Sequence, residues 1–525
     1  MQFMKCSRLL APAMCALLAS TVTFAQNPAS FNIVTSNAAP YNPGNIYSVD
    51  VNNDGLTDII QDGGYSPSAF FVSTNNGNGT FAAPVEYTLP VSTGEPTCIA
   101  AADFNNDGKI DLAVPLIGTS EIAVYLNNGN GTFKSPIVTT VNLPSGTTFA
   151  TAGCAAADFN GDGNKDFAAW TTAWTDGGME SSTELYVFQG EGNGSFSASS
   201  AYPVLAGPSF PYGMQVFVGD YDGDGKADIA ASAPAYSGDT STVYVLYGNN
   251  DFSFESTTPY VYSGLLWIGS GDLNSDGITD LYMLTNYSPA PQQVGVFYGD
   301  KSRTFASYWI DTPAGYYVGS GTAAWTWMSG LTMADYNGDG RMDLVASAVS
   351  SSSNAQSEVV FLAGTNPGEF TSQVVALPAQ SPWITSPVAG LLSGGYLKPD
   401  AVLNQSNTGS NDTTPTTLPA LLNTTEGLFG ICPYPKSGKG FDVCAAGLSK
   451  GEIAAFSAAV DSFGKLRTME LFVDGSKVAT QDHTWDTHAY FDWAGKFSTG
   501  THKGTFYAYD VDNSVQRYDF TFDVK

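Results

Sequence analysis

The stretch DYDGDGKADI at residues 220–229 places four carboxylates within nine positions and ends in two apolar residues that are typical of a starting strand. Only 13% of the whole chain is charged, so this density of acid is local. Carboxylates this close repel one another unless a cation or hydrogen-bond donors neutralise them. The stretch therefore indicates either a cation-binding loop or a turn held by its own backbone.

Five relatives of this stretch recur along the chain. They are DVNNDGLTDI from residue 50, DFNNDGKIDL from residue 103, DFNGDGNKDF from residue 158, DLNSDGITDL from residue 272 and DYNGDGRMDL from residue 335. In all six, positions 1, 5 and 9 are Asp, position 3 is Asn or Asp, position 6 is Gly, and positions 2 and 10 are apolar or aromatic. A second signature follows each one: an alternating strand, a polar turn and a Phe, as in AVYLNNGNGTF ending at Phe133.

The spacing of the repeats predicts an all-β fold, a seven-bladed β-propeller. The closing Asp residues of successive acidic loops lie 52 to 63 residues apart, and a seventh repeat keeps Asp400 without the acidic loop. About four short strands fit in each period, as in propeller blades, with the strand before the acidic loop innermost. The last repeat ends at Phe429 without a fourth strand. We expect the segment SFNIVTS from residue 30 to complete it and to close the ring.

The polar positions of the loop are the donors that calcium prefers. Oxygens at positions 1, 3, 5 and 9, a backbone carbonyl at position 7 and a Gly at position 6 for the sharp turn can surround one ion. Metal-free Asx turns are the alternative, which the sixfold recurrence of the pattern disfavours. Magnesium needs stricter geometry, and an EF-hand needs Glu at position 12, which all six loops lack.

We therefore expect up to six structural calcium ions as the only cofactor. The expected ligand positions are Asp50, Asn52, Asp54, Leu56 and Asp58; Asp103, Asn105, Asp107, Lys109 and Asp111; Asp158, Asn160, Asp162, Asn164 and Asp166; Asp220, Asp222, Asp224, Lys226 and Asp228; Asp272, Asn274, Asp276, Ile278 and Asp280; and Asp335, Asn337, Asp339, Arg341 and Asp343.

The acidic loops followed by Gly-x-Phe turns resemble FG-GAP repeats, which are also classed as VCBS-type repeats. The resemblance covers roughly residues 30–430. It implies a seven-bladed propeller like the integrin α-chain head, with calcium in the loop between the first and second strands of a blade. The seventh repeat departs from the pattern, so no metal is expected there. Proteins that share a fold differ in function, so the resemblance says more about fold than about role.

Charge and the N-terminal segment predict where the protein acts. The formal net charge is -29, from 49 acidic and 20 basic residues, which disfavours a nucleic acid partner. Residues 1–25 have a basic start at Lys5 and Arg8, an apolar stretch and small residues before Gln26, as in a signal peptide. No later stretch is long and apolar enough to be a transmembrane segment. We expect a secreted or cell-surface protein, from a bacterium.

Four cysteines remain after the signal peptide. Cys432 and Cys444 are close in a Pro- and Gly-rich stretch, and in an exported chain we expect them to form a disulfide. Cys98 and Cys154 lie on equivalent strands of neighbouring repeats but are offset by one residue. Their side chains should then face opposite ways, so we expect two buried free thiols.

The acidic loops stop before residues 431–525. RTMELFVDGSKVATQ predicts a hairpin with its turn at Asp474 and Gly475, and two more alternating strands follow. This segment resembles a bacterial Ig-like β-sandwich in broad architecture. The predicted organisation is a signal peptide at 1–25, a propeller at 26–430 and a sandwich at 431–525 that acts as a spacer or adhesion module.

The loops on the face away from the acidic loops are rich in aromatic residues. The candidate ligand face is made of Tyr65, Trp170, Trp174, Tyr236, Tyr287, Trp309, Tyr316, Tyr317 and Trp383. Exposed aromatic rings suit sugars or protein surfaces, although packing under their own loops is the alternative. All three His residues lie outside the propeller and no nucleophile motif is found. We expect a binding or adhesion module for an extracellular protein or glycan; the alternative is a carbohydrate-active lyase or hydrolase with the propeller as scaffold.

Overall fold

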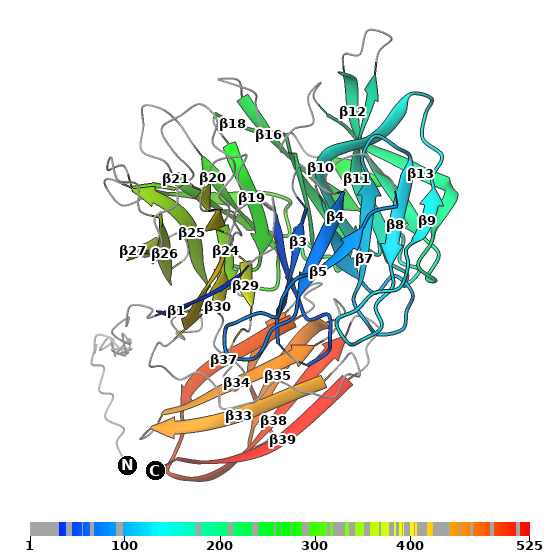
Figure 1. Cartoon of the computed structure of the whole chain (residues 1–525). Helices are drawn as coiled ribbons and strands as arrows, with labels where there is room; N and C mark the ends of the chain where they lie inside the picture. The colour runs from blue at the N-terminus through cyan, green and yellow to red at the C-terminus, as the bar shows by residue number, and fades with distance from the viewer. Residues whose placement is uncertain are drawn as a thin grey trace, which may run out of the picture.

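The structure is a computed structural model, and every element in its described part is a β-strand (Figure 1). This confirms the all-β class. The described residues are 31–37, 45–54, 56–63, 68–90, 98–174, 180–207, 214–233, 240–256, 259–263, 265–274, 276–285, 293–311, 316–318, 331–334, 336, 342–350, 357–366, 369–376, 383–384, 388–390, 392, 400–403, 405–406, 417–423, 442–450, 453–461, 466–482, 488–510 and 515–524. None of them belongs to a helix with the length and apolarity that crossing a bilayer requires. The predicted signal peptide lies outside them.

Between Phe31 and Asn423 the described strands form seven antiparallel sheets, and we number these sheets along the chain. Sheets one to three are β2 (Ile46–Val49), β3 (Asp58–Asp62), β4 (Ala69–Ser73) and β5 (Val85–Thr88); β6 (Ala100–Ala102), β7 (Asp111–Leu116), β8 (Glu121–Tyr125) and β9 (Ile137–Thr140); and β10 (Thr147–Ala157), β11 (Asp166–Trp174), β12 (Glu180–Gly190) and β13 (Phe196–Gly207).

Sheets four to seven follow the same order. They are β14 (Gln215–Gly219), β15 (Asp228–Ala233), β16 (Thr240–Gly248), β17 (Phe254–Ser256) and β18 (Tyr260–Ser263); β19 (Leu265–Gly271), β20 (Asp280–Thr285), β21 (Gln293–Gly299) and β22 (Phe305–Asp311); β23 (Tyr316–Val318), β24 (Leu331–Ala334), β25 (Asp343–Ser350), β26 (Ser357–Asn366) and β27 (Glu369–Ala376); and β28 (Trp383–Ile384), β29 (Val388–Gly390), β30 (Asp400–Val402), β31 (Gln405–Ser406), β32 (Thr417–Asn423) and β1 (Phe31–Asn37).

The sheets are arranged as in a β-propeller. The innermost strands contact one another in the cyclic order β6, β10, β14, β19, β24, β29 and β2. Sheets one and two complete the circle through a shared core in which Val49 and Ile60 pack with Ile99 and Leu112. The second strands are buried on both faces, because each lies between two neighbouring sheets, and β7 is buried at every residue.

The N-terminal strand closes the last sheet, as the sequence predicts. β1 pairs antiparallel with β32, from Phe31 opposite Asn423 to Asn37 opposite Thr417. Phe31 and Ile33 also pack against the core between sheets six and seven, which includes Tyr336. Pairing the two ends of the chain region in one sheet removes an exposed edge on β32.

The prediction of free thiols at Cys98 and Cys154 is wrong, because the two residues form a disulfide with their Cα atoms 5.8 Å apart. Side chains on opposite faces of two strands cannot meet within one sheet, but these strands belong to different sheets. Ala100 and Ala102 of sheet two face sheet three, and Cys154 and Ala156 of sheet three face back toward them. The one-residue offset therefore brings the two sulfurs together across the interface. The predicted Cys432–Cys444 pair is outside the described residues, because Cys432 is not described.

Removing this disulfide is expected to destabilise the ring. The bond closes a long segment between neighbouring sheets, with a sequence separation of 56 residues. Replacing Cys98 and Cys154 together with Ala should lower the free energy of unfolding by about 2–4 kcal/mol. Urea unfolding of the oxidised chain and the double variant measures the difference. If mass mapping of the unreduced protein finds Cys98 and Cys154 as free thiols and stability is unchanged, the bond is absent.

Two further antiparallel sheets make up the C-terminal part. One contains β33 (Asp442–Lys450), β34 (Ile453–Asp461) and β37 (His488–Lys496), and the other contains β35 (Leu466–Val473), β36 (Ser476–Asp482), β38 (Gly500–Asp510) and β39 (Val515–Val524). The expected hairpin is present, since Val473 pairs with Ser476 across Asp474 and Gly475. Met469, Leu471, Phe506 and Phe522 form the core beneath this second sheet. β33 also contacts β39 of the second sheet.

His502 ties the hairpin turn to the rest of this sheet. Its Nδ1 lies 2.7 Å from Asp474 Oδ2 and its Nε2 lies 2.8 Å from the Ser498 carbonyl oxygen. Both ring nitrogens face acceptors, so the imidazolium form satisfies both contacts and the pKa of His502 is raised, with the hydrogen bond to Asp474 as the main cause.

The stability of the C-terminal part is therefore expected to depend on pH. A histidine whose folded pKa lies above its unfolded value contributes stability below the unfolded pKa, near 6.5, and loses it as pH rises through the folded value. Melting should shift to lower temperature between pH 6 and pH 8 in the native chain. His502→Gln should flatten this dependence. An unchanged pH profile in the variant would show that the pair contributes nothing.

Candidate calcium-binding loops

The acidic loops connect the innermost strand of a sheet to the second strand. The first Asp of each loop follows the innermost strand, and the ninth residue, Asp, starts the second strand, as Asp228 starts β15. Loops one to five, numbered with their sheets, are described apart from Gly55 and Ser275. In loop six only Tyr336, Met342 and Asp343 are described, so the predicted ligands Asp335, Asn337, Asp339 and Arg341 lie outside the described part.

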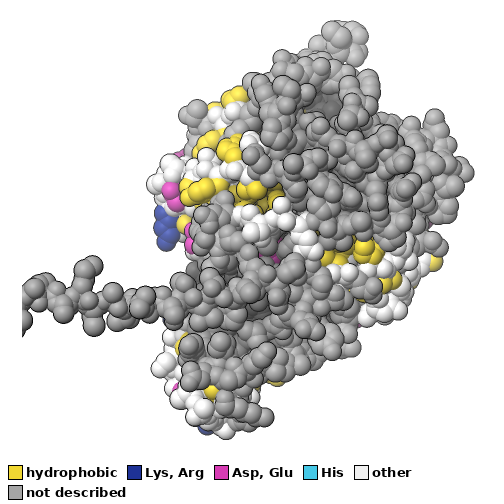
Figure 2. Space-filling model, turned by 90° about the vertical axis from the view of Figure 1, so that its left-hand side faces the viewer, with side chains coloured by type: hydrophobic (Ala, Val, Ile, Leu, Met, Phe, Trp, Pro, Cys, Tyr) yellow, Lys and Arg dark blue, Asp and Glu magenta, His cyan; other side chains and the backbone are white. Residues whose placement is uncertain are grey.

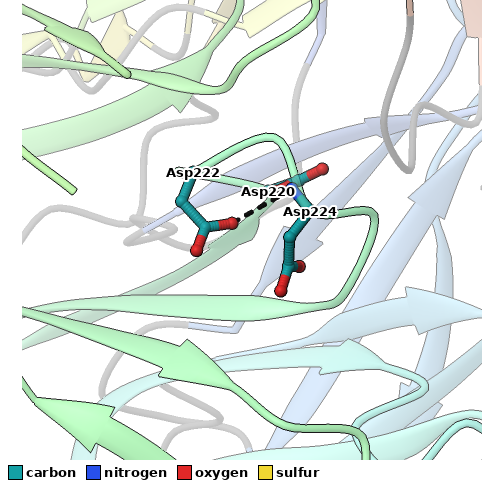
Figure 3. A group of neighbouring side chains, drawn as sticks. All are labelled: Asp220, Asp222 and Asp224. Atoms are coloured by element: carbon teal, nitrogen blue, oxygen red, sulfur yellow. Dashed lines mark hydrogen bonds between the residues drawn. The ribbon is translucent and has the colours of Figure 1, made fainter. Parts of the chain in front are cut away.

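Backbone N–H groups hold the carboxylates of loop four close together. Asp224 N donates to Asp220 Oδ1 at 3.0 Å and to Asp222 Oδ1 at 3.1 Å, and Gly225 N donates to Asp220 Oδ2 at 2.8 Å. As a result, one carboxylate oxygen from each of Asp220, Asp222 and Asp224 lies within 4.8 Å of the other two (Figure 3). Burial raises the pKa of Asp220 to about 6.

The other described loops repeat this geometry. The amide of the position-5 Asp donates both to the position-1 carboxylate and to the position-3 side-chain oxygen, and this holds for Asp54, Asp107, Asp162 and Asp276. The amide of position 7 then donates to the position-5 carboxylate, and this holds for Leu56, Lys109, Asn164, Lys226 and Ile278. Each loop thus directs its side-chain oxygens toward one region.

The closing Asp has a second role that the sequence prediction missed. Its side chain is fully buried, one oxygen accepts from the amide of position 2, and the other accepts from the amide that starts the turn between strands three and four. Asp228 accepts from Tyr221 N and Gly248 N, both at 2.8 Å. Asp58, Asp111, Asp166, Asp280 and Asp343 repeat the pair. The closing Asp therefore joins the loop, the second strand and the far turn.

Burial penalises the charged form of these carboxyls. It raises the pKa of Asp58, Asp228 and Asp280 to about 8, and that of Asp111 and Asp166 to about 7. The hydrogen bonds from backbone amides stabilise the anion and lower these pKa values, but burial has the larger effect. In the seventh sheet, which lacks the acidic loop, Leu392 N still donates to the buried Asp400 at 2.9 Å. The sequence could have indicated this hydrogen-bonding role through Asp400. This residue lies at the closing-Asp position of the seventh repeat, where no cation is expected.

The turn before the Phe contacts the acidic loop of the preceding sheet. Gly131 N donates to Val51 O at 3.3 Å, Gly194 N to Phe104 O at 2.9 Å, and Gly79 N to Leu392 O at 3.1 Å. The acceptors are the position-2 residues whose amides the closing Asp binds. These glycines have φ between 78° and 86°, and a Cβ would approach the neighbouring side chain to 2.8 Å or less. The two halves of the repeat signature thus meet across these three interfaces.

Comparison with protein families agrees with this arrangement. A model of the FG-GAP-like repeat matches residues 50–114, 116–169 and 272–346, and a model of the FG-GAP repeat matches residues 212–246. Together the matched segments contain all six acidic loops. The chain carries FG-GAP repeats. No curated protein sequence matches the chain.

Among solved structures, several are weakly similar to this chain. BBS1N in complex with ARL6DN, soaked with mercury, superposes with a TM-score of 0.45 and 11% identity, over 76% of this chain and 98% of that chain. The S. cerevisiae core factor gives a TM-score of 0.41 and 10% identity, over 76% and 62% of the two chains. The Clostridium thermocellum CbhA fibronectin(III)-like modules give a TM-score of 0.13 and 17% identity, over 35% of this chain and 85% of that chain. We draw nothing about function from likenesses at this level.

The donors of the FG-GAP loops suit a hard divalent cation. They are carboxylate, amide and carbonyl oxygens, without a nitrogen or sulfur donor, which is the set that calcium prefers. Lysine side chains neutralise part of the negative charge in two loops. Lys109 Nζ lies 2.8 Å from Asp107 Oδ2, and Lys226 Nζ lies 2.7 Å from Asp224 Oδ2. Both pairs are partly exposed, so they offset only part of the repulsion.

The structure describes the side chains of two residues of the predicted aromatic ligand face, Trp170 and Trp309. Trp170 is 1% exposed and packs with Leu185, Met214 and Val216, so its assignment to that face is wrong. Residues 170–174 and 180–182 of the stretch interpreted as a loop insert belong to strands β11 and β12, and alternation turns Trp170 toward sheet four. Trp309 is 40% exposed, on the outer strand β22.

The remaining aromatic residues of the predicted face are not described fully. Tyr65, Tyr236 and Tyr287 lie outside the described residues. Trp174 ends β11, Tyr316 and Tyr317 lie in β23, and Trp383 lies in β28, but the described part does not extend to their side chains.

Proposed function

We propose that this chain is an exported, calcium-binding β-propeller that acts outside the cell as a binding or adhesion module for a protein or a glycan. The observation that carries the proposal is the convergence of the Asp220, Asp222 and Asp224 oxygens, in a geometry that the other described FG-GAP loops repeat. Residues at positions 1, 3 and 5 would hold the ion, with the position-7 carbonyl and the closing Asp as further oxygen donors.

Calcium in these loops would supply positive charge and cross-link oxygens of one turn, not chemistry on a substrate. The loops lie at the interfaces between sheets, because the Gly-x-Phe turns dock on their position-2 carbonyls. Neutralised loops would therefore stiffen the contacts between sheets as well as each turn. A rigid ring is a suitable scaffold for recognition by its surface residues, since binding then costs little ordering entropy.

The outer strand of sheet five offers an exposed aromatic ring on each of its two faces. Trp309 and Tyr308 are both 40% exposed and point to opposite faces of β22. Each ring is held edge-to-face by a residue of β21, since Trp309 lies 5.4 Å from Phe297 and Tyr308 lies 5.6 Å from Tyr298. Figure 2 shows hydrophobic side chains gathered near acidic and basic ones on one side of the molecule. Fixed aromatic rings with polar neighbours suit sugars and protein surfaces.

The test is a binding screen of the full mature chain, from residue 26, on a glycan array and on immobilised extracellular matrix proteins. We expect binding without turnover in calcium, and weaker binding in chelator. Trp309→Ala should weaken it, whereas Val515→Ala, a change at an exposed apolar residue of the C-terminal sheet, should not. Release of unsaturated or reducing sugar ends from polysaccharides would overturn the binding role in favour of an enzyme. Absence of any binding would also overturn it.

A further inference from the structure

Loop four differs from the other five FG-GAP loops at position 3. It has Asp222 where the others have Asn, so it holds four carboxylates and each of the others holds three. The Asp222 side chain is only 5% exposed. Its Oδ2 accepts a hydrogen bond from Arg303 Nε at 2.8 Å, while its Oδ1 accepts from Asp224 N. The extra carboxylate of this loop is therefore paired with a protein cation.

Arg303 does not belong to sheet four. It lies in the turn between β21 and β22 of sheet five, at the place that Gly79, Gly131 and Gly194 occupy in their turns. Its φ is 62°, in the left-handed region that favours glycine. An arginine at a position with this backbone costs conformational energy, so its contacts must offset that cost.

The side-chain contacts that are described all reach back to sheet four. Besides Asp222, the guanidinium pairs with Glu255 and lies 4.6 Å from the centre of the Tyr247 ring. The same two sheets are also joined beside the loop, where Thr279 N donates to Asp220 O at 2.8 Å and Asp220 N donates to Thr279 Oγ1 at 3.0 Å. The first residue of loop four and its counter-ion are thus both fixed by sheet five.

We propose that Arg303 is a built-in counter-ion that sets the cation affinity of loop four. The proposal rests on the calcium role proposed above. Four carboxylates with Arg303 and Lys226 carry the same net charge as loop two, which has three carboxylates and Lys109. Arg303 therefore keeps loop four from becoming a site of much higher affinity, and it pairs Asp222 whenever the loop holds no cation. In that state it also holds sheet five against sheet four.

The test compares calcium binding and melting in the full mature chain and in four variants of it. In Arg303→Gln, isothermal titration should show one equivalent of calcium that binds about tenfold more tightly than in the native chain, because a unit positive charge next to a ligand carboxylate is removed. Its melting temperature in chelator should fall. Lys477→Gln, which removes the same charge from an exposed residue of β36 in the C-terminal part, should titrate like the native chain.

The double variant Asp222→Asn with Arg303→Gln should lose the tight equivalent, because loop four then has three carboxylates, an Asn at position 3 and a Lys at position 7, as loop two has. Asp222→Asn alone should lower the affinity for one equivalent of calcium about tenfold, since the guanidinium is left beside three carboxylates. This variant provides the test if Arg303→Gln does not fold. If the native chain binds no calcium, the proposed calcium role is overturned. If the native chain binds calcium but Arg303→Gln titrates like Lys477→Gln, only the role of Arg303 is overturned.

Discussion

Replacing Asp228 with Ala is expected to lower the free energy of unfolding by about 2–6 kcal/mol even in chelator, because each buried N–H left without an acceptor costs about 1–3 kcal/mol. The two amides concerned, from Tyr221 and Gly248, lie in buried positions and both donate to Asp228 at 2.8 Å. Denaturant unfolding of the native chain and the variant, both in chelator, measures the loss. If Asp228→Ala lowers the free energy of unfolding less than replacing an exposed loop carboxylate does, the hydrogen-bonding role is contradicted.

Two matched variants separate this role from cation binding. Asp224→Asn changes a side chain of the same loop that is 30% exposed, and it should cost less than about 1 kcal/mol in chelator while reducing the gain from calcium. Asp400→Ala lies in the sheet without an acidic loop, so its effect should be the same with and without calcium. A calcium-dependent effect at Asp400 would mean that the closing Asp acts only through a bound ion.

Removing calcium is expected to have the second large effect. A site that binds only the folded chain contributes about 2.7 kcal/mol when the free ligand is at 100 times its Kd. Several filled loops would together raise the melting temperature by about 10 °C or more for a ring of this size. The reason is electrostatic, since the chain carries a net charge of -29 and its loops concentrate that charge.

Calorimetry in millimolar calcium and in chelator measures the difference. Magnesium at the same concentration is the control, because its smaller size and octahedral preference fit these loops poorly. Sodium chloride at matched ionic strength separates site binding from general screening. Equal melting in all four solutions would contradict a structural role for calcium.

Much of the fold could be predicted because the repeat marks its own strands. The closing Asp of each acidic loop begins a strand, from Asp58 to Asp343, and so does Asp400 in the sheet without an acidic loop. The position of β1 in the last sheet also follows from the repeat, since the final unit lacks its fourth strand. These inferences depend only on period and alternation, which are local properties of the chain.

The errors and omissions concern contacts between sheets. Cys98 and Cys154 pair across an interface, and Trp170 packs against the next sheet, so side-chain direction within one strand was not sufficient to place them. The role of Arg303 is also invisible in its own repeat, because its partner Asp222 is 81 residues away in the chain. Within a sheet the period of two is regular, whereas the packing of one sheet on another depends on the whole ring.

A crystal structure of the mature chain grown in millimolar calcium tests the central claim most directly. We predict anomalous calcium peaks among the position-1, position-3 and position-5 oxygens of the acidic loops, including those of Asp220, Asp222 and Asp224, and no peak beside Asp400. Well-ordered loops without calcium at that concentration would contradict it.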